Sequence, residues 1–401
     1  MSTLPILVLN AGSSSIKFAI VSATVHQQAL LASGAVEGIG APGQGRCWLR
    51  NASESTLADQ PIEIADAAKG FSLITRLLAR HPELPPPAAI GHRMVCSSPE
   101  VTDNQRVTPE LLATLERYLH FAPLHTPPAL HILHHTLAAY PDVPNFIVLD
   151  SWFHRDLPLA SRSLPIPERF TALGVHRYGA HGLSYESIVD QLAPELPQRL
   201  IVAHLGNGSS IAAIQNGRSI DTSMGLTPTG GLISATRTGD IDPGVLLFLL
   251  RQLADSHPGT SDAANALEQI VNRQSGLLGV SGVSSDMRAL RNAIAAGDAD
   301  AQLAVDLFTT SIRRFIGAYI AQLGGLDMLV FTGGIGQHDS ATRAEVCHGL
   351  HALGITLDPA RKAAHDPHRI SADHSRVLVR TMAPAEDRII VRHVLQMLAS
   401  R

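Results

Sequence analysis

The chain contains two near-copies of one short phrase, one in each half. The first reads LNAGSSSIKFAI, from Leu9 to Ile20, and the second reads LGNGSSIAAI, from Leu205 to Ile214. Each copy follows an apolar run typical of a strand, passes through a turn of Gly, Asn and Ser, and re-enters an apolar stretch. This pattern predicts a β-hairpin with an exposed turn. One such turn is usually only a tight connection, but two copies indicate a duplicated fold.

A third phrase, LVFTGGIG from Leu329 to Gly336, also places glycines directly after an apolar run. Glycine lets the backbone approach a ligand closely and turn its amide groups outward, while Ser, Asn and Lys side chains add donors. Lys17 lies inside the first copy, where its ammonium group could reach a phosphate. The common nucleotide loop GxxxxGK[ST] is absent from the sequence. The three phrases therefore predict nucleotide binding by duplicated hairpins.

Length and composition exclude several classes of protein. A chain of 401 residues should form two domains. No apolar run reaches the roughly 18 residues needed to span a bilayer, and a net charge of −4 gives no reason to expect nucleic acid. The N-terminus runs directly into the first glycine phrase and does not resemble a signal peptide. Three scattered cysteines form no metal or disulfide pattern, so we expect a cytoplasmic protein.

Hydrophobic periodicity divides the chain into two halves of similar order. In the first half we expect three strands, a helix at 66–80, a strand at 88–94, two helices between 108 and 140, and a strand at 145–150. In the second half we expect a helix at 184–196, a strand at 199–206 leading into the hairpin, helices between 242 and 274, a long helix at 300–323, a strand at 327–333 and a closing helix at 386–399.

This order predicts an α/β fold whose mixed β-sheets are flanked by helices. The predicted first domain comprises residues 1–150 with 384–401, and the second comprises residues 151–383.

Polar residues that directly follow apolar runs are the first candidates for a ligand site, because ligands gather at the carboxyl ends of strands. These residues are Asn10, Arg93, Asp150, His204 and Asn207. An Asp in this position is a helix or turn cap about as often as it is part of a ligand site. An Arg within an apolar strand, by contrast, needs an anionic partner, because guanidinium does not lose its charge.

The stretch from Asp221 to Pro243 is poor in large side chains and carries Arg237 among Thr, Gly and Asp. It has two readings, a long surface loop or a mobile phosphate clamp that reaches the oxygens of a transferring phosphoryl group. His125 and His181 are flanked by small residues or Pro, which favours exposed, positioned imidazoles.

A further cluster contains His131, His134 and His135. Their helical spacing, with no carboxylate or cysteine near them in the sequence, favours a polar helix face over a metal site.

Together the motifs resemble the acetate kinase family, within the actin-like, sugar-kinase and Hsp70 ATPase superfamily. They occur in the family's order and span almost the whole chain: NAGSSSIKF, GHRMV, APLH, YGAHG, HLGNGSS, DTSMGLTP, TRTGDIDP, SSDMR and FTGGIG. The resemblance implies duplicated ribonuclease H-like domains with a cleft between them. It also implies a homodimer that transfers the γ-phosphoryl group of ATP to a short-chain carboxylate, reversibly, giving an acyl phosphate and ADP. The implied metal ion is Mg²⁺, for which Mn²⁺ can substitute.

The resemblance assigns roles to individual residues. The metal ligands are Asn10 and Glu386. The catalytic residues are Arg93, which grips the substrate carboxylate, Asp150, which the family treats as a proton carrier, and His125, His181 and Arg237. Besides Arg93, the substrate residues are Val95, Leu124, Ala180 and Pro228, which form the acyl pocket. The nucleotide residues are Lys17, His204, Leu205, Gly206, Asn207, Gly208, Asp286, Met287, Arg288, Gly334, Ile335, Gly336, Gln337 and His338.

The chemistry of the acceptor tests the role of Asp150. A short carboxylic acid titrates near pH 4 to 4.5, so it is already an anion at neutral pH and needs no general base. We therefore expect Asp150 to orient Mg²⁺ or its waters. The main obstacle is the repulsion between two anions, which Arg93, Arg237, His181 and the metal ion would offset. We expect the two arginines to converge on one cleft.

The sequence departs from the family pattern at several positions. Ala180 replaces a Phe in the acyl pocket, which should enlarge the pocket. A methylene shifts preference by only about 1 to 3 kcal/mol, so we expect propionate to be used comparably with acetate, with butyrate as a further candidate. The other departures are Thr126 and Ala385 for Asn, Gly230 for an acidic residue, Gln337 for Glu and His338 for Asn.

Two other functions remain open on the residues alone. A sugar or polyol kinase of the same superfamily would need Asp150 as a true base, but its neutral alcohol would give Arg93 no partner. A non-catalytic ATP-driven switch would have no use for the substrate-side residues.

Overall fold

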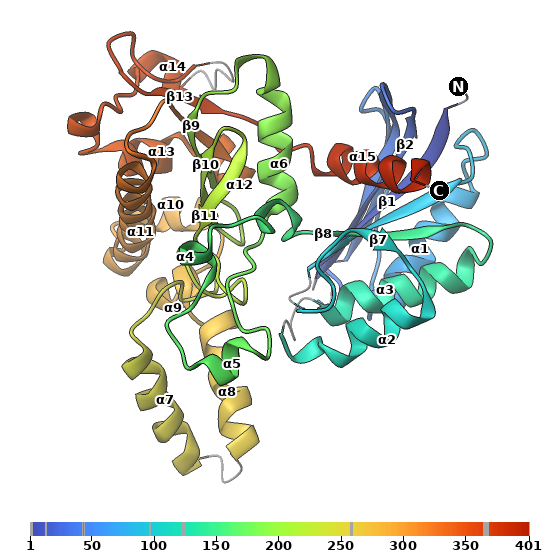
Figure 1. Ribbon diagram of the computed structural model, residues 1–401, viewed down its shortest axis with the longest axis horizontal. Helices are drawn as coiled ribbons and strands as arrows, with labels where there is room; N and C mark the ends of the chain where they lie inside the picture. The colour runs from blue at the N-terminus through green and yellow to red at the C-terminus, as the bar shows by residue number, and fades with distance from the viewer. Residues whose placement is uncertain are drawn as a thin grey trace. The chain divides into compact units, whose positions relative to one another are not determined.

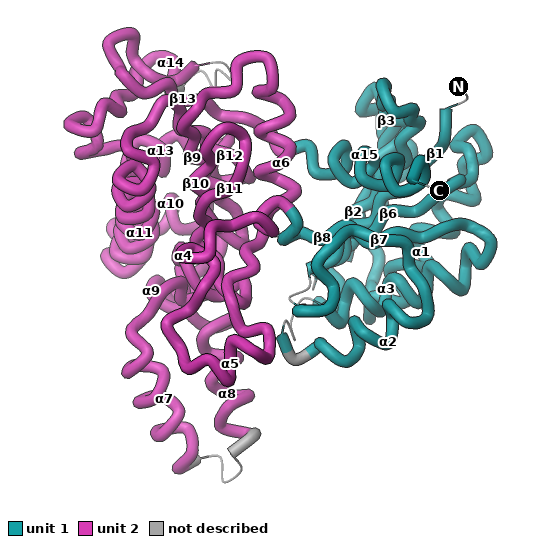
Figure 2. Tube along the Cα trace, in the orientation of Figure 1, with its two compact units in different colours: residues 1–152, 385–401 teal, residues 153–384 magenta. Residues whose placement is uncertain are grey.

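The computed structural model describes residues 3–12, 14–41, 43, 45–95, 98–121, 126–256, 260–363 and 369–400. The chain forms two compact units, which Figure 2 distinguishes by colour. Unit 1 comprises Met1–Trp152 and Ala385–Arg401, and unit 2 comprises Phe153–Pro384. The sequence predicts these boundaries at residues 150/151 and 383/384.

Unit 1 is built on a mixed sheet in the order β5-β4-β3-β2-β1-β6-β8-β7 (Figure 1). Its strands are β1 (Leu4–Ala11), β2 (Ser15–Ala23), β3 (Gln28–Glu37), β4 (Arg46–Asn51), β5 (Thr56–Pro61), β6 (Ala89–Met94), β7 (Gln105–Arg106) and β8 (Asn145–Leu149). Strand β6 runs parallel to both β1 and β8, and the other pairs are antiparallel. The first glycine phrase is a hairpin, as predicted, with Asn10 opposite Lys17.

Helices cover both faces of this sheet. Helices α1 (Ala67–Ala79) and α3 (Thr126–Ala139) pack on one face, with α2 (Pro109–Arg117) against α3, and α15 (Glu386–Ala399) packs on the other (Figure 1). The sequence predicts all four. Helix α1 begins where Asp66 accepts a hydrogen bond from the Lys69 amide, and α2 begins where Thr108 does the same for Leu111 ahead of a first-turn proline.

Unit 2 repeats the plan with a smaller sheet, in the order β11-β10-β9-β12-β13. Its strands are β9 (Arg199–His204), β10 (Ser210–Gln215), β11 (Arg218–Thr222), β12 (Met328–Thr332) and β13 (Leu378–Thr381). Strands β9, β10 and β11 form an antiparallel meander, and β12 runs parallel to β9 and β13. The strands β3-β2-β1-β6-β8 of unit 1 have the same order and directions, so the duplication predicted from the two glycine phrases is present.

The helices of unit 2 are more numerous. They are α4 (Leu159–Arg162), α5 (Glu168–Thr171), α6 (Gly182–Gln191), α7 (Pro243–Ser256), α8 (Thr260–Arg273), α9 (Gly276–Ser281), α10 (Met287–Ala295), α11 (Ala299–Leu323), α12 (Gly333–His338), α13 (Ser340–Cys347) and α14 (Pro359–Ala363). The predicted helix at 184–196 is too long, because α6 ends at Gln191 and Pro194 lies in a separate 3₁₀ turn.

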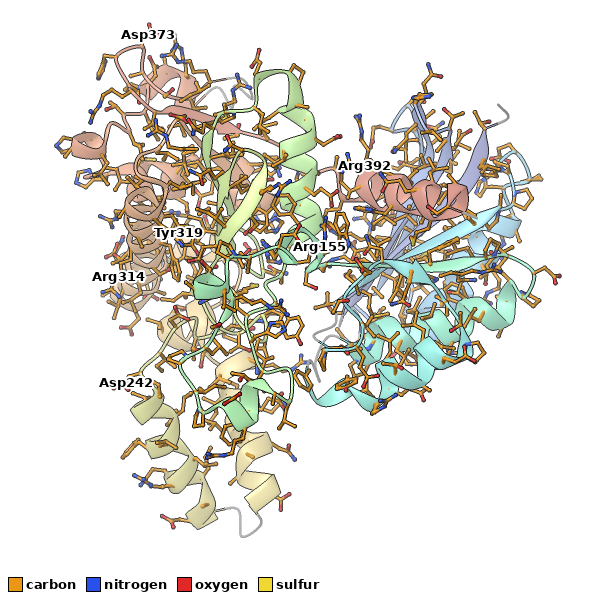
Figure 3. All side chains as sticks on the ribbon, in the orientation of Figure 1. Arg155, Asp242, Arg314, Tyr319, Asp373 and Arg392 are labelled. Carbon is orange, nitrogen blue, oxygen red and sulfur yellow. The ribbon has the colours of Figure 1, made fainter. Side chains whose placement is uncertain are left out.

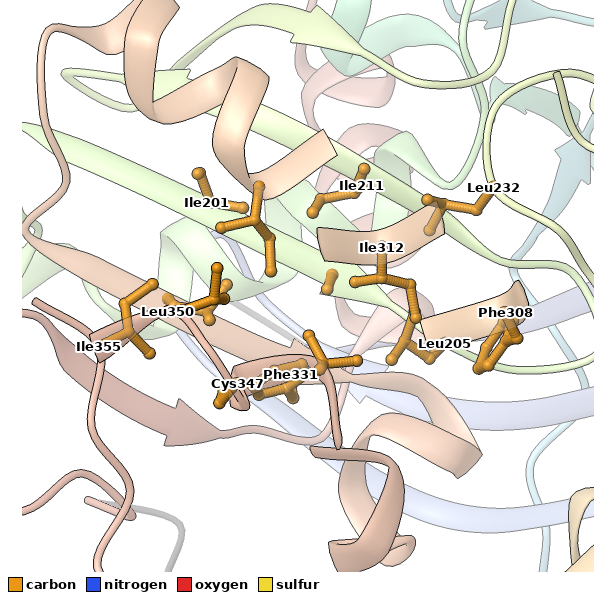
Figure 4. Packing of buried hydrophobic residues seen from close by; sticks show 14 of the residues in the cluster. Ile201, Leu205, Ile211, Leu232, Phe308, Ile312, Phe331, Cys347, Leu350 and Ile355 are labelled. Atoms are coloured by element: carbon orange, nitrogen blue, oxygen red, sulfur yellow. The ribbon is translucent and has the colours of Figure 1, made fainter. Parts of the chain in front are cut away.

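Alternate residues of the unit 2 strands serve two cores. Figure 4 shows Ile201 and Phe331 packed with Phe308 and Ile312 of α11 on one face. Val202 and Val330 point to the other face, where they meet Tyr185 and Ile188 of α6. Charged side chains such as Asp242, Arg314 and Asp373 remain exposed (Figure 3). Among the helices that the structure describes, none is long and apolar enough to cross a membrane.

The sheet in unit 1 contains strands that the sequence does not predict, among them the two-residue β7. The sequence predicts three strands before the first helix, but β4 and β5 follow them. Strand β5 contains no buried residue, so it lacks the alternation of apolar and polar residues by which an edge strand is recognised.

Candidate active site

In unit 1, three neighbouring parallel strands end at one edge of the sheet and bring polar side chains together. Arg93, on β6, donates from Nε to Asp150 Oδ1 at 2.9 Å and from Nη1 to Asn10 Oδ1 at 3.0 Å. Asn10 lies near the end of β1, and Asp150 directly follows β8 and is only 1% exposed. The strand-end residues of unit 1 therefore form one hydrogen-bonded group.

Helix α15 adds a second carboxylate to this group, because Asn10 Nδ2 donates to Glu386 Oε2 at 3.3 Å. The helix can approach because residue 91 is a glycine. A Cβ at Gly91 would lie 2.6 Å from Ile390 Cγ2 and 2.9 Å from Val394 Cγ2. The missing side chain thus lets α15 pack directly on β6, with its first residue at the strand ends.

The group holds more negative than positive charge. Burial raises the pKa of Glu386, and the nearby Arg93 opposes this shift only in part, since Asp150 and Asp387 add to it. Burial disfavours the charge of Arg93, but Asp150, followed by Glu386, raises the pKa of its guanidinium above the ordinary value. Burial also raises the pKa of Asp387, against the influence of exposed Lys17. One guanidinium does not balance the charge of these carboxylates, so a bound cation would be favourable here.

The loop after β6 is tied to helix α3. Thr126, where the family has Asn, is buried and donates from Oγ1 to the Val95 carbonyl at 2.9 Å. This bond fixes Val95, a predicted acyl-pocket residue, beside the start of α3. Leu124 and His125, which we also predicted, lie outside the described residues.

In unit 2, two histidines connect helix α6 with the sheet, each through a serine on the opposite element. His181, just before α6, has Nδ1 2.8 Å from Ser210 Oγ of β10. His204, on β9, has Nδ1 2.8 Å from Ser184 Oγ of α6. The two rings stack with centroids 4.3 Å apart. The prediction of an exposed imidazole at His181 is wrong, because this stacking packs the half-buried ring.

The second glycine turn lies against His181 and Arg237. A Cβ at Gly208 would lie 3.2 Å from Arg237 Nη1 and 3.4 Å from His181 Nε2. Arg237 Nη1 also donates to the Pro228 carbonyl at 3.3 Å, so one predicted acyl-pocket residue touches this group. Ala180, another, is buried directly before His181. The predicted phosphoryl-binding residues of unit 2 are therefore side by side.

The segment that carries Arg237 is anchored to the hairpin. The Ala235 amide donates to the Asn207 carbonyl at 3.1 Å, and the Ser209 amide donates to Ser234 Oγ at 3.0 Å. Met224 and Leu232 are fully buried. The reading of this stretch as a surface loop is therefore wrong, since its backbone holds Arg237 beside the glycine turn.

The third glycine phrase adjoins the second. Strand β12 leads straight into α12, and the Ile335 amide donates to the Leu205 carbonyl at 2.9 Å. Gly333 has a φ of 77°, and a Cβ there would lie 2.5 Å from the Leu205 oxygen, so only glycine fits. The Leu205 side chain lies in the core (Figure 4), which leaves only its backbone for a nucleotide.

The remaining nucleotide candidates lie on helices joined to α12. Asp286 caps α10 by accepting from the Arg288 amide at 2.8 Å, and its hydrogen bond from the Arg288 side chain is the main cause that lowers the pKa of Asp286 to about 2. Met287 packs in the core. Arg291 of α10 donates to Asp339 Oδ2 at 3.2 Å, and Asp339 caps α13 directly after His338.

Several supporting residues escape prediction from sequence. Arg343 is fully buried and donates from Nη1 to the carbonyls of Gly336 and Gln337 at 2.9 and 2.8 Å. Gln337 also donates to the Gly333 carbonyl at 3.2 Å. Nothing in the sequence marks Arg343, because its partners are backbone oxygens. Ser210, by contrast, lies inside the repeated phrase and could have been noticed.

The histidine cluster on α3 is a polar face, with one unexpected partner. His131 and His135 approach through their Nε2 atoms at 3.0 Å, and His134 Nε2 lies 3.2 Å from Glu116 Oε1 of α2. The fold thus brings a carboxylate of another helix to the cluster, although none lies near these histidines in the sequence. Within the described ranges, no group of three or more His, Cys, Asp or Glu side chains could hold a metal ion.

Comparison with known proteins settles the family. A profile of the Acetokinase family matches residues 5–392. The chain belongs to this family. A propionate kinase from Citrobacter rodentium is 38% identical over 400 residues, covering 98% of this chain and 96% of that protein. An acetate kinase from Clavibacter michiganensis subsp. michiganensis is 38% identical over 401 residues, covering 97% and 98%.

The solved structures confirm the fold of this Acetokinase family member. The crystal structure of a propionate kinase from Francisella tularensis subsp. tularensis superposes with a TM-score of 0.87 at 32% identity, covering 98% of this chain and 99% of that one. The predicted fold class is thus confirmed. Membership in the Acetokinase family also supports ATP-dependent phosphorylation of a carboxylate as the activity.

Proposed function

We propose that this chain transfers the γ-phosphoryl group of ATP to a short-chain carboxylate, acetate or propionate, and forms an acyl phosphate and ADP reversibly. The observation that supports the proposal is the position of Arg93. Its guanidinium stands on a strand at the edge where β1, β6 and β8 end, held by Asp150 and Asn10. A permanent charge in this position suits an anionic acceptor, because a neutral alcohol would give it no partner.

The phosphate-binding groups belong to unit 2. Arg237 Nη1 and His181 Nε2 both face the Gly208 backbone, where no side chain intervenes. A phosphoryl group at this turn would receive one charged donor and one imidazole donor as its oxygens gain charge in the transition state. The convergence of Arg93 and Arg237 stays a prediction.

No side chain needs to remove a proton from the acceptor. The carboxylic acid is ionised at neutral pH, and the Asp150 carboxylate already accepts from Arg93 Nε. We propose that Asp150 orients the guanidinium and the metal ion instead of acting as a base.

The unit 1 group fits Mg²⁺. Asn10, Asp150 and Glu386 present amide and carboxylate oxygens, the ligands that this ion prefers. Burial raises the pKa of Glu386, so a cation beside it would stabilise the ionised carboxylate. Few protein ligands suffice, because Mg²⁺ in nucleotide sites keeps waters and binds phosphates. When bound, the ion would offset the charge of the phosphates. Mn²⁺ accepts the same oxygen ligands.

We propose that ATP lies along the segments joined in unit 2. The glycine turn after β9 meets α12, and Arg291 links α10 to the residue that follows α12. At Leu205 and Met287 the side chains are buried, so we assign nucleotide contact there to the backbone. The side chain of Arg288 is exposed, and its ion pair with Asp286 at 2.8 Å holds the guanidinium at the start of α10, where we propose that it contacts the nucleotide.

The acyl pocket should accept more than acetate. Ala180 lacks the ring that the family pattern has at this position, and its loss enlarges the pocket. Both acetate kinases and propionate kinases stand among the relatives, at similar identity. We propose that propionate is used comparably with acetate.

A substrate panel with hydroxylamine tests the proposed function. Only an acyl phosphate yields a hydroxamate, so acetate, propionate and butyrate should each be scored for hydroxamate and ADP. We expect hydroxamate with acetate and propionate, and a large rise in the KM for the acid in R93A. ADP release without hydroxamate, or phosphorylation of glycerol or a sugar, would overturn the proposal in favour of a switch or a sugar kinase.

We further propose a cytoplasmic homodimer without membrane or nucleic-acid partners. Its basis is the family resemblance, together with buried free thiols at Cys47 and Cys347. Sedimentation of the purified protein at several concentrations would measure the oligomeric state.

A further inference from the structure

We infer that Tyr185 and Ser210 hold His181 in one neutral tautomer, with its ring hydrogen on Nε2. Both are positioning residues, because they act through His181. The catalytic consequence rests on the proposed function, whereas the tautomer itself follows from the contacts in unit 2.

Three side chains form a chain of hydrogen bonds from the core to the glycine turn. The Tyr185 hydroxyl bonds Ser210 Oγ, which lies 2.8 Å from His181 Nδ1. Tyr185 and Ser210 are both fully buried. Tyr185 lies one turn along α6 from His181, and Ser210 lies on β10, directly opposite His204. The chain therefore joins the helix start to the repeated hairpin.

The direction of the hydrogen bonds depends on which hydroxyl donates, and we infer that the Tyr185 phenol does. A serine hydroxyl has one hydrogen to donate, and a phenol is the more acidic donor. If Tyr185 donates to Ser210, the Ser210 hydrogen goes to His181 Nδ1, which is then an acceptor. The ring hydrogen of neutral His181 must then lie on Nε2. This is the atom that faces Gly208, 3.4 Å from the position of a Cβ there.

Two neighbours flank the His181 ring. The His204 ring stacks on it with centroids 4.3 Å apart, and the permanently charged Arg237 faces the same glycine through Nη1. In this arrangement Arg237 supplies the charge, and His181 supplies an oriented N–H donor to the phosphoryl oxygens.

The backbone of His181 is held in a sparsely populated conformation. Its φ is 57°, in the left-handed region, and its carbonyl accepts from the Tyr185 amide at 3.1 Å. Such a conformation in a non-glycine residue persists only where the surroundings enforce it. Tyr185 therefore fixes His181 twice, through its amide and, via Ser210, through its hydroxyl.

The test is the tautomer of His181, read by long-range ¹H–¹⁵N NMR of histidine-labelled protein at about pH 8, where imidazole is neutral. We expect the wild type to show hydrogen on Nε2, and S210A to lose that preference. Y185F should weaken it while keeping the ring that fills the core. The His204 tautomer should stay unchanged in both variants, because Ser184 bonds its Nδ1, and this also shows that the local fold is intact. S187A, at another buried serine of α6, is the matched control.

Hydrogen on Nδ1 in the wild type, or an unchanged His181 tautomer in both S210A and Y185F, would overturn the inference. Kinetics supply the second readout. We expect S210A to lower kcat about tenfold, the size of one hydrogen bond, with little change in the KM for ATP. An unchanged kcat would remove the positioning role. The NMR result needs no turnover, so a wild type that forms no acyl phosphate would refute the proposed function and leave the tautomer assignment standing.

Discussion

Single residues of the site combine permanent charges with neutral donors. Arg93 and Arg237 carry guanidinium groups that cannot be neutralised, and each has a different setting. Arg93 is held by a carboxylate and an amide, whereas Arg237 donates to a backbone carbonyl and lies against Gly208. Their substitution should therefore affect different steps, acid binding for the first and phosphoryl transfer for the second.

Replacing Arg237 by Ala should lower kcat by about 10³ to 10⁵, because a charged donor to the transferring phosphoryl group would be lost. Nucleotide affinity should stay nearly intact, since the glycine turn and α12 remain. The hydroxamate assay gives the turnover, and calorimetry with ATP gives the affinity. Unchanged turnover would show that Arg237 is not a clamp.

Replacing Asp150 by Asn separates a base from an orienting residue. The amide keeps an oxygen that can accept from Arg93 Nε but removes the charge. We expect the variant to need more Mg²⁺ for half-maximal rate and to retain kcat within about tenfold at saturating Mg²⁺. A loss of about 10²-fold or more under those conditions is what removal of a general base would produce, and would contradict us.

Restoring the aromatic ring with A180F should narrow the acyl pocket. We expect kcat/KM for propionate to fall relative to acetate by about tenfold, in line with the energy of one methylene in a pocket. The ratio across acetate, propionate and butyrate measures the effect, and thermal melting checks that the buried position tolerates the ring. Strong acetate preference in the wild type, unaltered by A180F, would refute the role.

At the scale of elements, helix α15 shows how packing places a side chain. Glu386 reaches the strand ends because α15 lies directly on β6, and that approach depends on Gly91. The helical period of residues 386–399 predicts the helix itself, with Ile390 and Val394 on its buried face. The pairing of that face with one glycine on a strand almost 300 residues earlier in the sequence is not predictable from either segment alone.

The substitution G91A should push α15 from the sheet. Overpacking at such a contact destabilises by about 1 to 3 kcal/mol, so thermal unfolding should shift downward, with weaker Mg²⁺ dependence as Glu386 moves. G317A is a matched control, because a Cβ there meets nothing within 4 Å and Ala favours the interior of α11. Equal melting of wild type and G91A would show that α15 tolerates the displacement.

At the scale of the whole molecule, the unit 1 group links stability to pH. Burial raises the pKa of Glu386 above its ordinary 4.5, against the opposing effect of Arg93. An acid whose pKa is higher in the folded state contributes stability below its unfolded pKa, and loses that contribution as the pH rises through the folded pKa. At neutral pH the ionised Glu386 carboxylate therefore lowers the free energy of unfolding of the metal-free protein.

The substitution E386Q should consequently raise the melting temperature of metal-free protein near pH 7.5, and the difference should shrink below about pH 4. Added Mg²⁺ should stabilise the wild type by mass action but not the variant. E63Q, at an exposed carboxylate, should change neither. A variant less stable than the wild type at both pH values would show that attraction to Arg93 outweighs burial.

Sequence reasoning reaches the duplicated fold because its signals are local. Glycines at the end of apolar runs mark the turns after β1 and β9. The ordered motifs indicate the family, as the Acetokinase match confirms. Sequence reasoning misses a strand where burial does not alternate, as in β5. It also misses a supporting residue whose hydrogen bonds go to backbone oxygens, as for Arg343. It also overestimates the exposure of His181, because stacking on His204 joins residues that are distant in the chain.

The amino-acid order alone determined the elements, the duplication, the family and the residue types available for chemistry, because each depends on neighbours within a few turns or on ordered motifs. The tertiary structure decided which atoms meet. It placed Asp150, Asn10 and Glu386 around Arg93, and it paired each of His181 and His204 with a serine on another element. Such contacts depend on how strands and helices pack, and the energy of that packing is shared among residues far apart in the chain.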